Sequence, residues 1–198
     1  MNEKIILFGG SFDPPHLGHL IIAQRVAEML SGIVRFLPCG NPPHKQPLSS
    51  WAHRLAMLRV ALEDNPYFCL DESEIAAETV NYTVDTLKRF QREYGIGRDE
   101  LYFILGSDSL NALGSWRQPE AILQLCTLVV YPREPGFNIQ EYPEEMIEQM
   151  IFCSAPIIGI SSTLIRERVK KGQGIKYLVP EAVRKYICST GLYLEGIG

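Results

Sequence analysis

Short apolar runs alternate with segments of helical periodicity along almost the whole chain. The runs have the length and composition of buried strands: KIILF (4–8), IVRFLP (33–38), FCLD (68–71), LYFIL (101–105), CTLVVY (126–131) and PIIGI (156–160). Between them, apolar residues recur every three or four positions, as on one face of a helix. This alternation is typical of a parallel sheet whose right-handed crossovers are helices that cover both faces.

Capping residues, glycines and prolines give the bounds of the expected helices. These cover about 17–30, 49–65, 82–94 and 161–171, with a last helix from about 180. The second carries Trp51, Leu55 and Leu58 on one face, and Asn81 is expected to cap the third. No clear period occurs over 132–150. We therefore predict a single-domain α/β fold over residues 1–198, a Rossmann-like doubly wound parallel sheet with helices on both faces.

Charge and hydropathy exclude several classes of protein. The formal net charge is −4, so no broad basic surface for a nucleic-acid partner is expected. No apolar stretch reaches the roughly eighteen residues of a membrane span, and the first residues do not resemble a secretory signal. We thus expect a cytoplasmic protein without a membrane partner. The five cysteines are widely spaced and form no CxxC pair, so reduced thiols are expected.

The run GGSFDPPHLGHL (9–20) follows the first predicted strand and contains few residues that favour helix or strand. Gly9 and Gly10 carry no Cβ, so a sharp backbone turn that approaches a ligand is expected there. Asp13 precedes a proline, which keeps it out of the helical region, as an N-cap requires. The run therefore predicts a rigid entry into a helix that starts beside a ligand.

The two histidines of this run point to phosphate. His16 and His19 are three residues apart, so both imidazoles lie on one face of the first helical turn, and Gly18 leaves that face open. A helix start with two imidazoles favours a phosphate group. A plain turn and a zinc site are alternatives, but no third zinc ligand comes from the same element. The nucleotide patterns GxGxxG and GxxxxGK[ST] are both absent, so this phosphate site is of another kind.

A second phosphate site is expected in SSTLIR (161–166). Each of Ser161, Ser162 and Thr163 is also typical of a helix cap. Thr163 and Arg166 are three residues apart, so a hydroxyl and a guanidinium point the same way beside the N–H groups of the helix start. In a parallel sheet, this segment and residues 9–20 both belong at the carboxyl edge of the strands, where ligands bind.

Three further segments each have two interpretations. His44 and Lys45 lie in a long proline-rich loop, where they either reach over a bound anion or are solvated. Asp108 in GSDSL either accepts hydrogen bonds from ribose hydroxyls or caps the next helix. Trp116 follows a short helix, where it either stacks on a planar ring or is buried in the core.

Taken together, GGSFDPPHLGH with its HxGH core, NPPHK, NYT, the GSD and Trp116 segments and ISSTLIR resemble the bacterial nicotinate-nucleotide adenylyltransferases of the HxGH nucleotidyltransferase superfamily. The motifs occur in the family's order over nearly the whole chain. The resemblance implies one nucleotidyltransferase domain that transfers the adenylyl group of ATP to nicotinate mononucleotide (NaMN). The products would be deamido-NAD (nicotinate adenine dinucleotide) and pyrophosphate, in NAD biosynthesis. Mg²⁺ would accompany ATP, with no metal site of the protein's own.

The resemblance also implies roles for individual residues. Catalytic contacts to the ATP phosphates would come from His16, His19 and Arg166. The ATP-binding positions would be Gly9, Gly10, Ser11, Phe12, Gly18, Ser162 and Thr163. The mononucleotide-binding positions would be Lys45, Tyr82, Thr83, Gly106, Asp108, Trp116 and Arg133. Asn81 stands where the family more often has serine, and little consequence is expected, because the family contact there is made through the backbone.

Two other functions stay open at this stage. The first is an adenylyltransferase of the same superfamily that acts on nicotinamide mononucleotide (NMN) or on phosphopantetheine. The second is a module that binds a nucleotide without catalysis. A homo-oligomer is compatible with the sequence, which does not define an oligomeric state.

Overall fold

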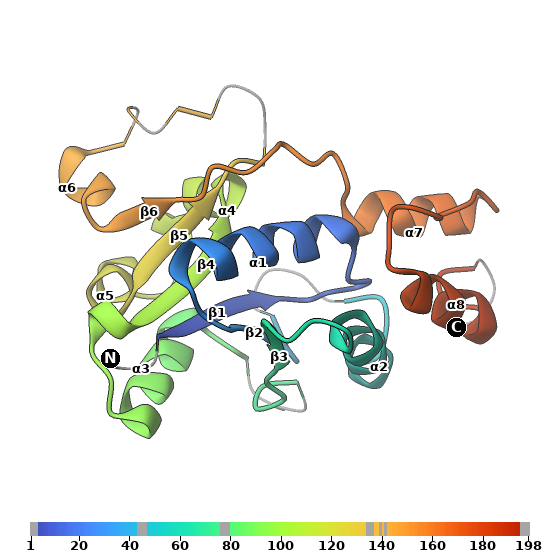
Figure 1. The fold of residues 1–198 in the computed structure, drawn as a ribbon, viewed down its shortest axis with the longest axis horizontal. Helices are drawn as coiled ribbons and strands as arrows, with labels where there is room; N and C mark the ends of the chain where they lie inside the picture. The colour runs from blue at the N-terminus through green and yellow to red at the C-terminus, as the bar shows by residue number, and fades with distance from the viewer. Residues whose placement is uncertain are drawn as a thin grey trace.

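A parallel sheet of six strands forms the centre of the molecule (Figure 1). This computed structural model describes residues 4–42, 47–75, 80–133, 137–138, 140 and 142–194. The strands lie in the order β3-β2-β1-β4-β5-β6, and each adjacent pair is parallel. Their bounds are β1 Ile5–Gly10, β2 Val34–Pro38, β3 Phe68–Leu70, β4 Leu101–Gly106, β5 Thr127–Tyr131 and β6 Met150–Phe152.

Helices connect the strands and cover both faces of the sheet. Their bounds are α1 Leu17–Leu30, α2 Trp51–Leu62, α3 Thr83–Tyr94, α4 Ser107–Asn111, α5 Pro119–Leu125, α6 Glu144–Ile147, α7 Ser162–Lys170 and α8 Glu181–Thr190. Two short 3₁₀ turns, Arg98–Glu100 and Leu113–Ser115, precede β4 and follow α4. The termini of the described chain lie at opposite ends of the molecule (Figure 1).

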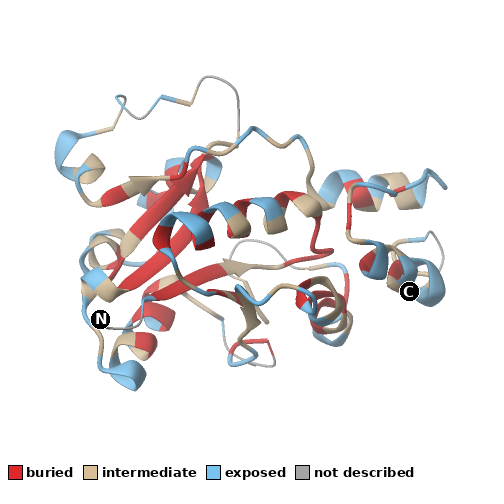
Figure 2. Ribbon diagram, in the orientation of Figure 1, coloured by how far each residue is buried: buried red, intermediate tan, exposed pale blue. Residues whose placement is uncertain are grey.

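The central strands β1, β2, β4 and β5 are mostly buried, whereas the edge strands β3 and β6 are largely half-buried (Figure 2). Alternate residues of the central strands enter different apolar clusters. In β1, Ile6 and Phe8 pack with α1 and α2, whereas Ile5 and Leu7 pack with α3 and α5. Such continuous apolar strands are characteristic of a sheet covered on both sides. Because the period of a strand is two, a run such as KIILF supplies both cores at once.

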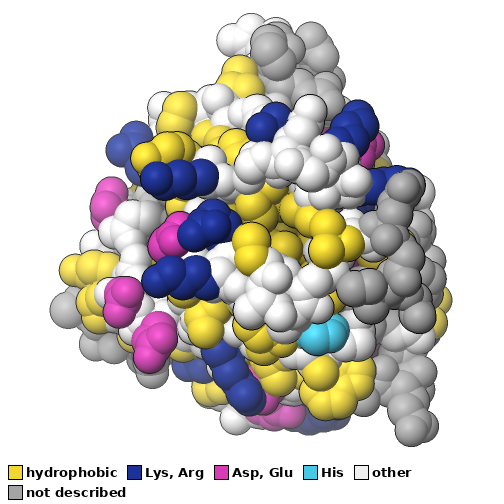
Figure 3. Space-filling view, turned by 90° about the vertical axis from the view of Figure 1, so that its right-hand side faces the viewer, with side chains coloured by type: hydrophobic (Ala, Val, Ile, Leu, Met, Phe, Trp, Pro, Cys, Tyr) yellow, Lys and Arg dark blue, Asp and Glu magenta, His cyan; other side chains and the backbone are white. Residues whose placement is uncertain are grey.

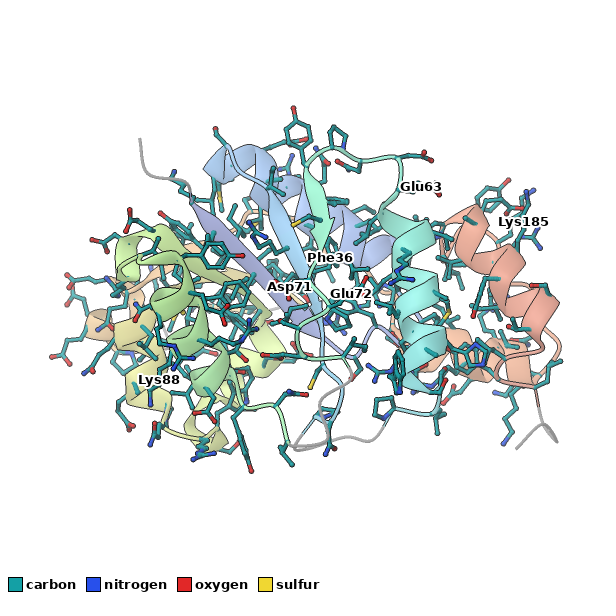
Figure 4. All side chains as sticks on the ribbon, turned by 90° about the horizontal axis from the view of Figure 1, so that it is seen from below. Phe36, Glu63, Asp71, Glu72, Lys88 and Lys185 are labelled. Carbon is teal, nitrogen blue, oxygen red and sulfur yellow. The ribbon has the colours of Figure 1, made fainter. Side chains whose placement is uncertain are left out.

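A third apolar cluster lies away from the sheet. Ile165 of α7 and Val183 and Ile187 of α8 pack with Met57 of α2. Figure 4 shows α8 beside α2, with the labelled Lys185 of α8 pointing outward. The segment that carries ISSTLIR is therefore supported by α2 and α8 rather than by the strands.

The strand order reverses direction at β1. The chain proceeds from β1 to β2 and β3 on one side, and β4 then pairs with β1 on the other side. The connections leave the carboxyl ends of β1 and β4 in opposite directions and open a crevice between them. Open α/β sheets bind their ligands at this point.

The predicted α/β fold with a doubly wound parallel sheet is confirmed, and five of the predicted strands are present. PIIGI (156–160) is not a strand, because the chain leaves the sheet after β6. The apolar composition of this segment has another cause: Ile158 packs against the first cluster and Ile160 against the third. The last strand, β6, forms instead from residues 150–152, at the edge of the stretch that showed no clear period.

Two helix details also differ from the sequence prediction. Leu55 and Leu58 of α2 are buried as expected. Trp51, the first residue of this helix, is 50% exposed, because the buried residues of α2 begin one turn later. The predicted end of α3 at Gly95 is confirmed by its left-handed conformation. Among the described residues, no helix is both long and apolar enough to cross a membrane.

Candidate active site

A cavity of about 330 Å³ opens at the carboxyl ends of β1 and β4. The end of β1, the first turn of α1, the start of α3 and the loop after β4 all contribute to its lining. Phe8 and Phe103 provide apolar walls, and Arg133 and Asp108 provide charged groups. The cavity therefore lies in the crevice that the reversal of strand order creates.

The two histidines of HxGH are held against each other at the start of α1. His16 is the N-cap, and its Nδ1 accepts from the N–H of His19 at 3.4 Å. The N–H of His16 donates in turn to Nδ1 of His19 at 3.2 Å, and the two rings stack with centroids 3.6 Å apart. Because a backbone N–H only donates, each Nδ1 is an acceptor and each neutral ring carries its proton on Nε2.

Burial keeps both imidazoles neutral. His16 is 2% exposed, and burial, with a smaller contribution from Arg133, lowers its pKa to about 3. Burial likewise lowers the pKa of His19 well below its usual value, helped by His16 and Arg133. A bound polyphosphate would oppose these shifts by favouring the imidazolium form. Near neutral pH the pair thus offers two Nε2–H donors rather than two fixed positive charges.

The sharp turn after β1 lies at Phe12, whose φ is 49°. Gly9 and Gly10 stay within β1 and remain paired with β2, so the expected turn at these glycines is wrong. A Cβ on Gly9 would come within 3.2 Å of the Phe103 ring, and one on Gly10 within 3.1 Å of the Phe12 ring. A side chain at either position would displace the adjacent ring by a few tenths of an ångström, so glycine suits the close approach of the two rings.

Asp13 does not cap α1, because His16 occupies that position. Its carboxylate is 3% exposed and accepts hydrogen bonds from the N–H groups of Leu48 at 2.7 Å and Ser49 at 3.2 Å. The hydroxyls of Ser49 and Tyr193 also donate to it, the latter at 2.6 Å. A buried carboxylate is stable only with several donors. Asp13 therefore fixes the loop before α2 and the end of the described chain.

The three hydroxyl residues at the start of α7 have three different roles. Ser161 caps the helix, because its side chain accepts from the N–H of Leu164 at 3.1 Å. Ser162 donates to the carbonyl of Pro14 at 2.9 Å. Thr163 is exposed and accepts from the guanidinium of Arg166 at 3.1 Å, as their spacing predicts.

Arg166 connects α7 to the loop after β1 by donating to the carbonyl of Asp13 at 2.7 Å. Its guanidinium lines a second cavity of about 190 Å³, together with Ser162, Phe12 and His19. His19 also lines the larger cavity, so the two spaces meet at this residue. HxGH and ISSTLIR, which lie far apart in the sequence, therefore face one space, as expected for a shared phosphate site.

The start of α3 forms the opposite end of the larger cavity. Tyr82 is the N-cap and makes no side-chain capping bond, and both Tyr82 and Thr83 line the cavity. The first N–H groups of a helix lack partners within the helix, so they can bind an anionic group. Trp116 is half-buried and lines the same end, where its indole is available to a planar ring.

Asn81 does not cap α3, contrary to the sequence prediction. Its side-chain oxygen accepts from the N–H of Asn41 at 3.0 Å and from the thiol of Cys39 at 3.5 Å. Its own N–H donates to the carbonyl of Asn41 at 3.1 Å. Asn81 instead ties the loop after β2 to the start of α3.

Asp108 lies at the carboxyl end of β4 and does not cap α4, whose N-cap is Gly106. Its carboxylate forms an ion pair with Arg133, with Nε and Oδ2 3.7 Å apart. A Cβ on Gly106 would lie 2.6 Å from the Cγ of Arg133, so glycine is required for these two side chains to meet. Both charged side chains line the larger cavity.

The family model for cytidylyltransferase-like proteins matches residues 7–168. A relative from Desulfitobacterium hafniense (strain DSM 10664 / DCB-2), named "Probable nicotinate-nucleotide adenylyltransferase", is 40% identical over 96% of both chains. A relative of the same name from Geobacillus kaustophilus is 42% identical over 96% of this chain and 86% of its own. This chain belongs to the nicotinate-nucleotide adenylyltransferase family. Its members are nucleotidyltransferases, and the chain is an enzyme of that class.

Solved structures share the fold of this nicotinate-nucleotide adenylyltransferase family member. The Plasmodium falciparum nicotinic acid mononucleotide adenylyltransferase complexed with NaAD superposes with a TM-score of 0.80 at 21% identity, over 97% of this chain and 98% of that one. The same protein complexed with APC gives a TM-score of 0.78 at 20% identity over the same shares. The Rossmann-like architecture is thus confirmed by this likeness.

Most residues expected from the family pattern lie in or beside the two cavities. Lys45 is outside the described residues. His16 and Gly18 line neither cavity, because His16 is buried behind His19 and Gly18 faces the other side of the first turn of α1, toward Ile158. Thr163 lines neither cavity but a wider groove of about 620 Å³ between α2, α7 and the end of α8. Figure 3 shows this end of the molecule, where lysine and arginine side chains stand among apolar ones.

Sequence reasoning missed a buried arginine that supports the site. Arg54 of α2 is 1% exposed and donates to the carbonyls of Ser11 at 3.0 Å, Cys39 at 2.6 Å and Gly40 at 3.2 Å. It therefore joins the loops after β1 and β2. The helical pattern contained a signal, because Arg54 lies next to Leu55 and one turn before Leu58, on the buried side.

No metal cluster accompanies these residues in the part of the chain that the structure describes. There, no group of three or more His, Cys, Asp or Glu side chains is arranged to hold an ion. The donors that line the smaller cavity are the neutral imidazole of His19, against which the buried His16 stacks, and the guanidinium of Arg166. Such donors bind phosphate oxygens directly.

Proposed function

We propose that this chain transfers the adenylyl group of ATP to NaMN and so forms deamido-NAD and pyrophosphate, a step of NAD biosynthesis. The observation that carries the proposal is the shared space between His19 of HxGH and Ser162 and Arg166 of ISSTLIR, continuous with a cavity that ends at Trp116. Membership of the nicotinate-nucleotide adenylyltransferase family supports the same reaction.

In this proposal the ATP phosphates lie between α1 and α7. His16, His19 and Arg166 donate to them and are the catalytic residues, because their contacts strengthen as charge develops on the departing pyrophosphate. Gly18 leaves the imidazole face accessible, since a Cβ there would lie 3.0 Å from the His16 ring. The remaining ATP-binding positions are Gly9, Gly10, Ser11, Phe12, Ser162 and Thr163.

The mononucleotide occupies the larger cavity. Its pyridine ring stacks on Trp116, and its carboxylate accepts from the backbone N–H groups at Tyr82 and Thr83. Asp108 accepts from ribose hydroxyls at the carboxyl end of β4, next to Gly106. Arg133 and Lys45 bind substrate phosphates.

The chemistry needs alignment and charge stabilisation rather than a general base. The second pKa of a phosphate monoester is about 6, so the attacking phosphate of NaMN is already largely ionised at neutral pH. The cavity would hold this phosphate and the α-phosphorus of ATP in line, and the donors of α1 and α7 would stabilise the pyrophosphate. The neutral state of both histidines agrees with their role as hydrogen-bond donors.

A divalent metal accompanies ATP in nucleotidyltransferases, and we propose Mg²⁺ here. Mg²⁺ prefers phosphate oxygens and water and needs few protein carboxylates, which fits a site whose described donors are imidazole and guanidinium groups. When bound to ATP it would neutralise charge on the phosphates.

The test is a product assay with purified protein, ATP and Mg²⁺, in which NaMN, NMN and phosphopantetheine are compared as acceptors. We expect pyrophosphate and deamido-NAD, with the highest kcat/KM for NaMN. A higher kcat/KM for either of the other acceptors would assign the chain to another activity of the superfamily. Binding of ATP without pyrophosphate release from any acceptor would identify a nucleotide-binding module instead.

A further inference from the structure

Arg117 directly follows Trp116 and lines the same end of the cavity. None of the sequence motifs described above assigns it a role. The centre of its guanidinium lies 4.8 Å from the centroid of the Tyr82 ring, at the start of α3. Its Nη1 donates to Oδ2 of Asp85 at 3.3 Å. A cation therefore stands where the proposed function places the pyridine ring and its substituent.

Two contacts fix the direction of this side chain. Stacking on Tyr82 holds the guanidinium plane over a residue that itself lines the cavity, and Asp85 holds one of its nitrogens. A guanidinium has five N–H donors in a planar fork that matches a carboxylate. Among the residues that the structure describes, Arg117 donates one hydrogen bond, to Asp85, so the rest of the fork is available to a ligand.

The neighbouring acidic groups leave this end of the cavity attractive to an anion. Glu74 lines the cavity, but burial raises its pKa, and its carboxyl accepts from the Thr86 hydroxyl and lies 3.6 Å from Arg89. Asp85 is as exposed as Arg117, 54% against 52%, and contacts only Nη1, so the other guanidinium nitrogens can still face an anion. The uncapped start of α3 adds partial positive charge.

We propose that the Arg117 side chain is a specificity-determining group that favours a ring carboxylate over a ring carboxamide in the mononucleotide. A carboxylate offers two oxygens that accept charge-assisted hydrogen bonds from the guanidinium, whereas a carboxamide offers one neutral oxygen, and its NH₂ can only donate. This inference rests on the proposed function. In the proposed function, only the backbone N–H groups at Tyr82 and Thr83 bind the ring carboxylate. Arg117 adds a side chain that favours NaMN over NMN.

The test compares wild-type protein with Arg117→Gln, using NaMN and NMN as acceptors. Glutamine keeps a polar side chain but removes the charge and the fork. We expect kcat/KM for NaMN to fall about 5-fold, mainly through KM, because the contact is remote from the reacting phosphate and partly exposed. We expect kcat/KM for NMN and the KM for ATP to change by less than about 2-fold. The ratio of kcat/KM for NaMN to kcat/KM for NMN should therefore fall.

Two further variants separate charge from structure. Arg117→Lys keeps the charge and should retain part of the preference. Arg59→Gln is the matched control, because Arg59 is similarly exposed, 59% against 52%, and pairs with a surface carboxylate, Glu72, away from the cavity. Its ratio of NaMN to NMN activity should equal that of the wild type. Raising the salt concentration should lower the ratio of kcat/KM for NaMN to kcat/KM for NMN more in the wild type than in Arg117→Gln, because salt screens the charge of the guanidinium.

The outcomes distinguish this inference from the proposed function. Suppose that the wild type forms product from NaMN, but that Arg117→Gln leaves the ratio of kcat/KM for NaMN to kcat/KM for NMN unchanged, for instance by lowering both values equally. The role proposed for Arg117 is then wrong, and the proposed reaction stands. If the wild type forms no product from NaMN, the proposed function itself is wrong. Thermal unfolding of each variant, monitored by circular dichroism, shows whether a loss of activity reflects loss of folded protein.

Discussion

At the scale of single residues, the histidine pair shows how backbone geometry sets side-chain chemistry. Each Nδ1 accepts from the backbone N–H of the other histidine, which leaves Nε2–H as the donor of each ring. Burial holds the pKa of both rings low, so this donor state is the prevailing one near neutral pH. The sequence could place the two rings on one face, but their protonation depends on burial and on Arg133.

His19→Ala should lower kcat about 100-fold or more while changing the KM for ATP much less, because removal of one donor from developing charge typically has this effect. His19→Gln should retain more activity than His19→Ala, since its amide N–H can take the place of Nε2–H. Steady-state kinetics with saturating NaMN measure both variants.

His53→Ala is the control for this comparison. His53 lies on α2, and its Nδ1 is 2.9 Å from the hydroxyl of Tyr186. It lines the wider groove with Thr163 but neither of the two cavities proposed for the substrates. Its kcat should stay within about 2-fold of the wild type. An unchanged kcat in His19→Ala would contradict the catalytic role of His19.

At the scale of structural elements, two buried charges of opposite sign assemble the loops of the site. Asp13 collects donors from the loop before α2 and from Tyr193, and Arg54 donates to the carbonyls that follow β1 and β2. Burial lowers the pKa of Arg54, and the charge of Asp13 opposes this shift. Charge-assisted bonds therefore fix the site loops together with apolar packing such as that of Phe12.

Tyr193→Phe should lower the free energy of unfolding by about 1–3 kcal/mol, because a buried carboxylate loses a donor. Burial and Asp13 raise the pKa of Tyr193, so its hydroxyl remains protonated and the bond persists over the ordinary pH range. Urea unfolding measures the change. Tyr177→Phe is the control, because Tyr177 is 76% exposed, and it should shift the free energy by less than about 0.5 kcal/mol. Equal losses in both variants would contradict the role of the Asp13 network.

The elements differ in how far the sequence could predict them. β1 and β4 could be predicted because a short run of consecutive apolar residues between polar segments is typical of a buried strand. PIIGI was misassigned because a segment that crosses between two apolar clusters has the same composition as a strand. Asp13 and Asn81 were assigned as caps from local spacing, whereas their partners lie in distant loops that spacing cannot indicate. The two segments proposed to bind phosphate could be placed at helix starts, since each has a local signature there.

At the scale of the whole molecule, the two halves of the proposed phosphate site belong to different apolar clusters. HxGH follows β1 and is supported by the sheet, whereas α7 is supported by the third cluster with α2 and α8. Ser162 and Arg166 join the halves through the carbonyls of Pro14 and Asp13. The affinity for ATP should therefore depend on packing at α8, although α8 lies away from the sheet.

Ile187→Ala tests this dependence, because Ile187 is 1% exposed in the third cluster. We expect the free energy of unfolding to fall by about 2–5 kcal/mol, as for other buried aliphatic truncations. We also expect the Kd for ATP, measured by calorimetry on folded protein, to rise about 3- to 10-fold, because α7 loses support. Leu128→Ala is the matched control, since Leu128 is fully buried in the second cluster. It should lose similar stability but keep its affinity for ATP. If both variants bind ATP like the wild type, α7 is held by its bonds to the loop after β1, and packing at α8 contributes stability alone.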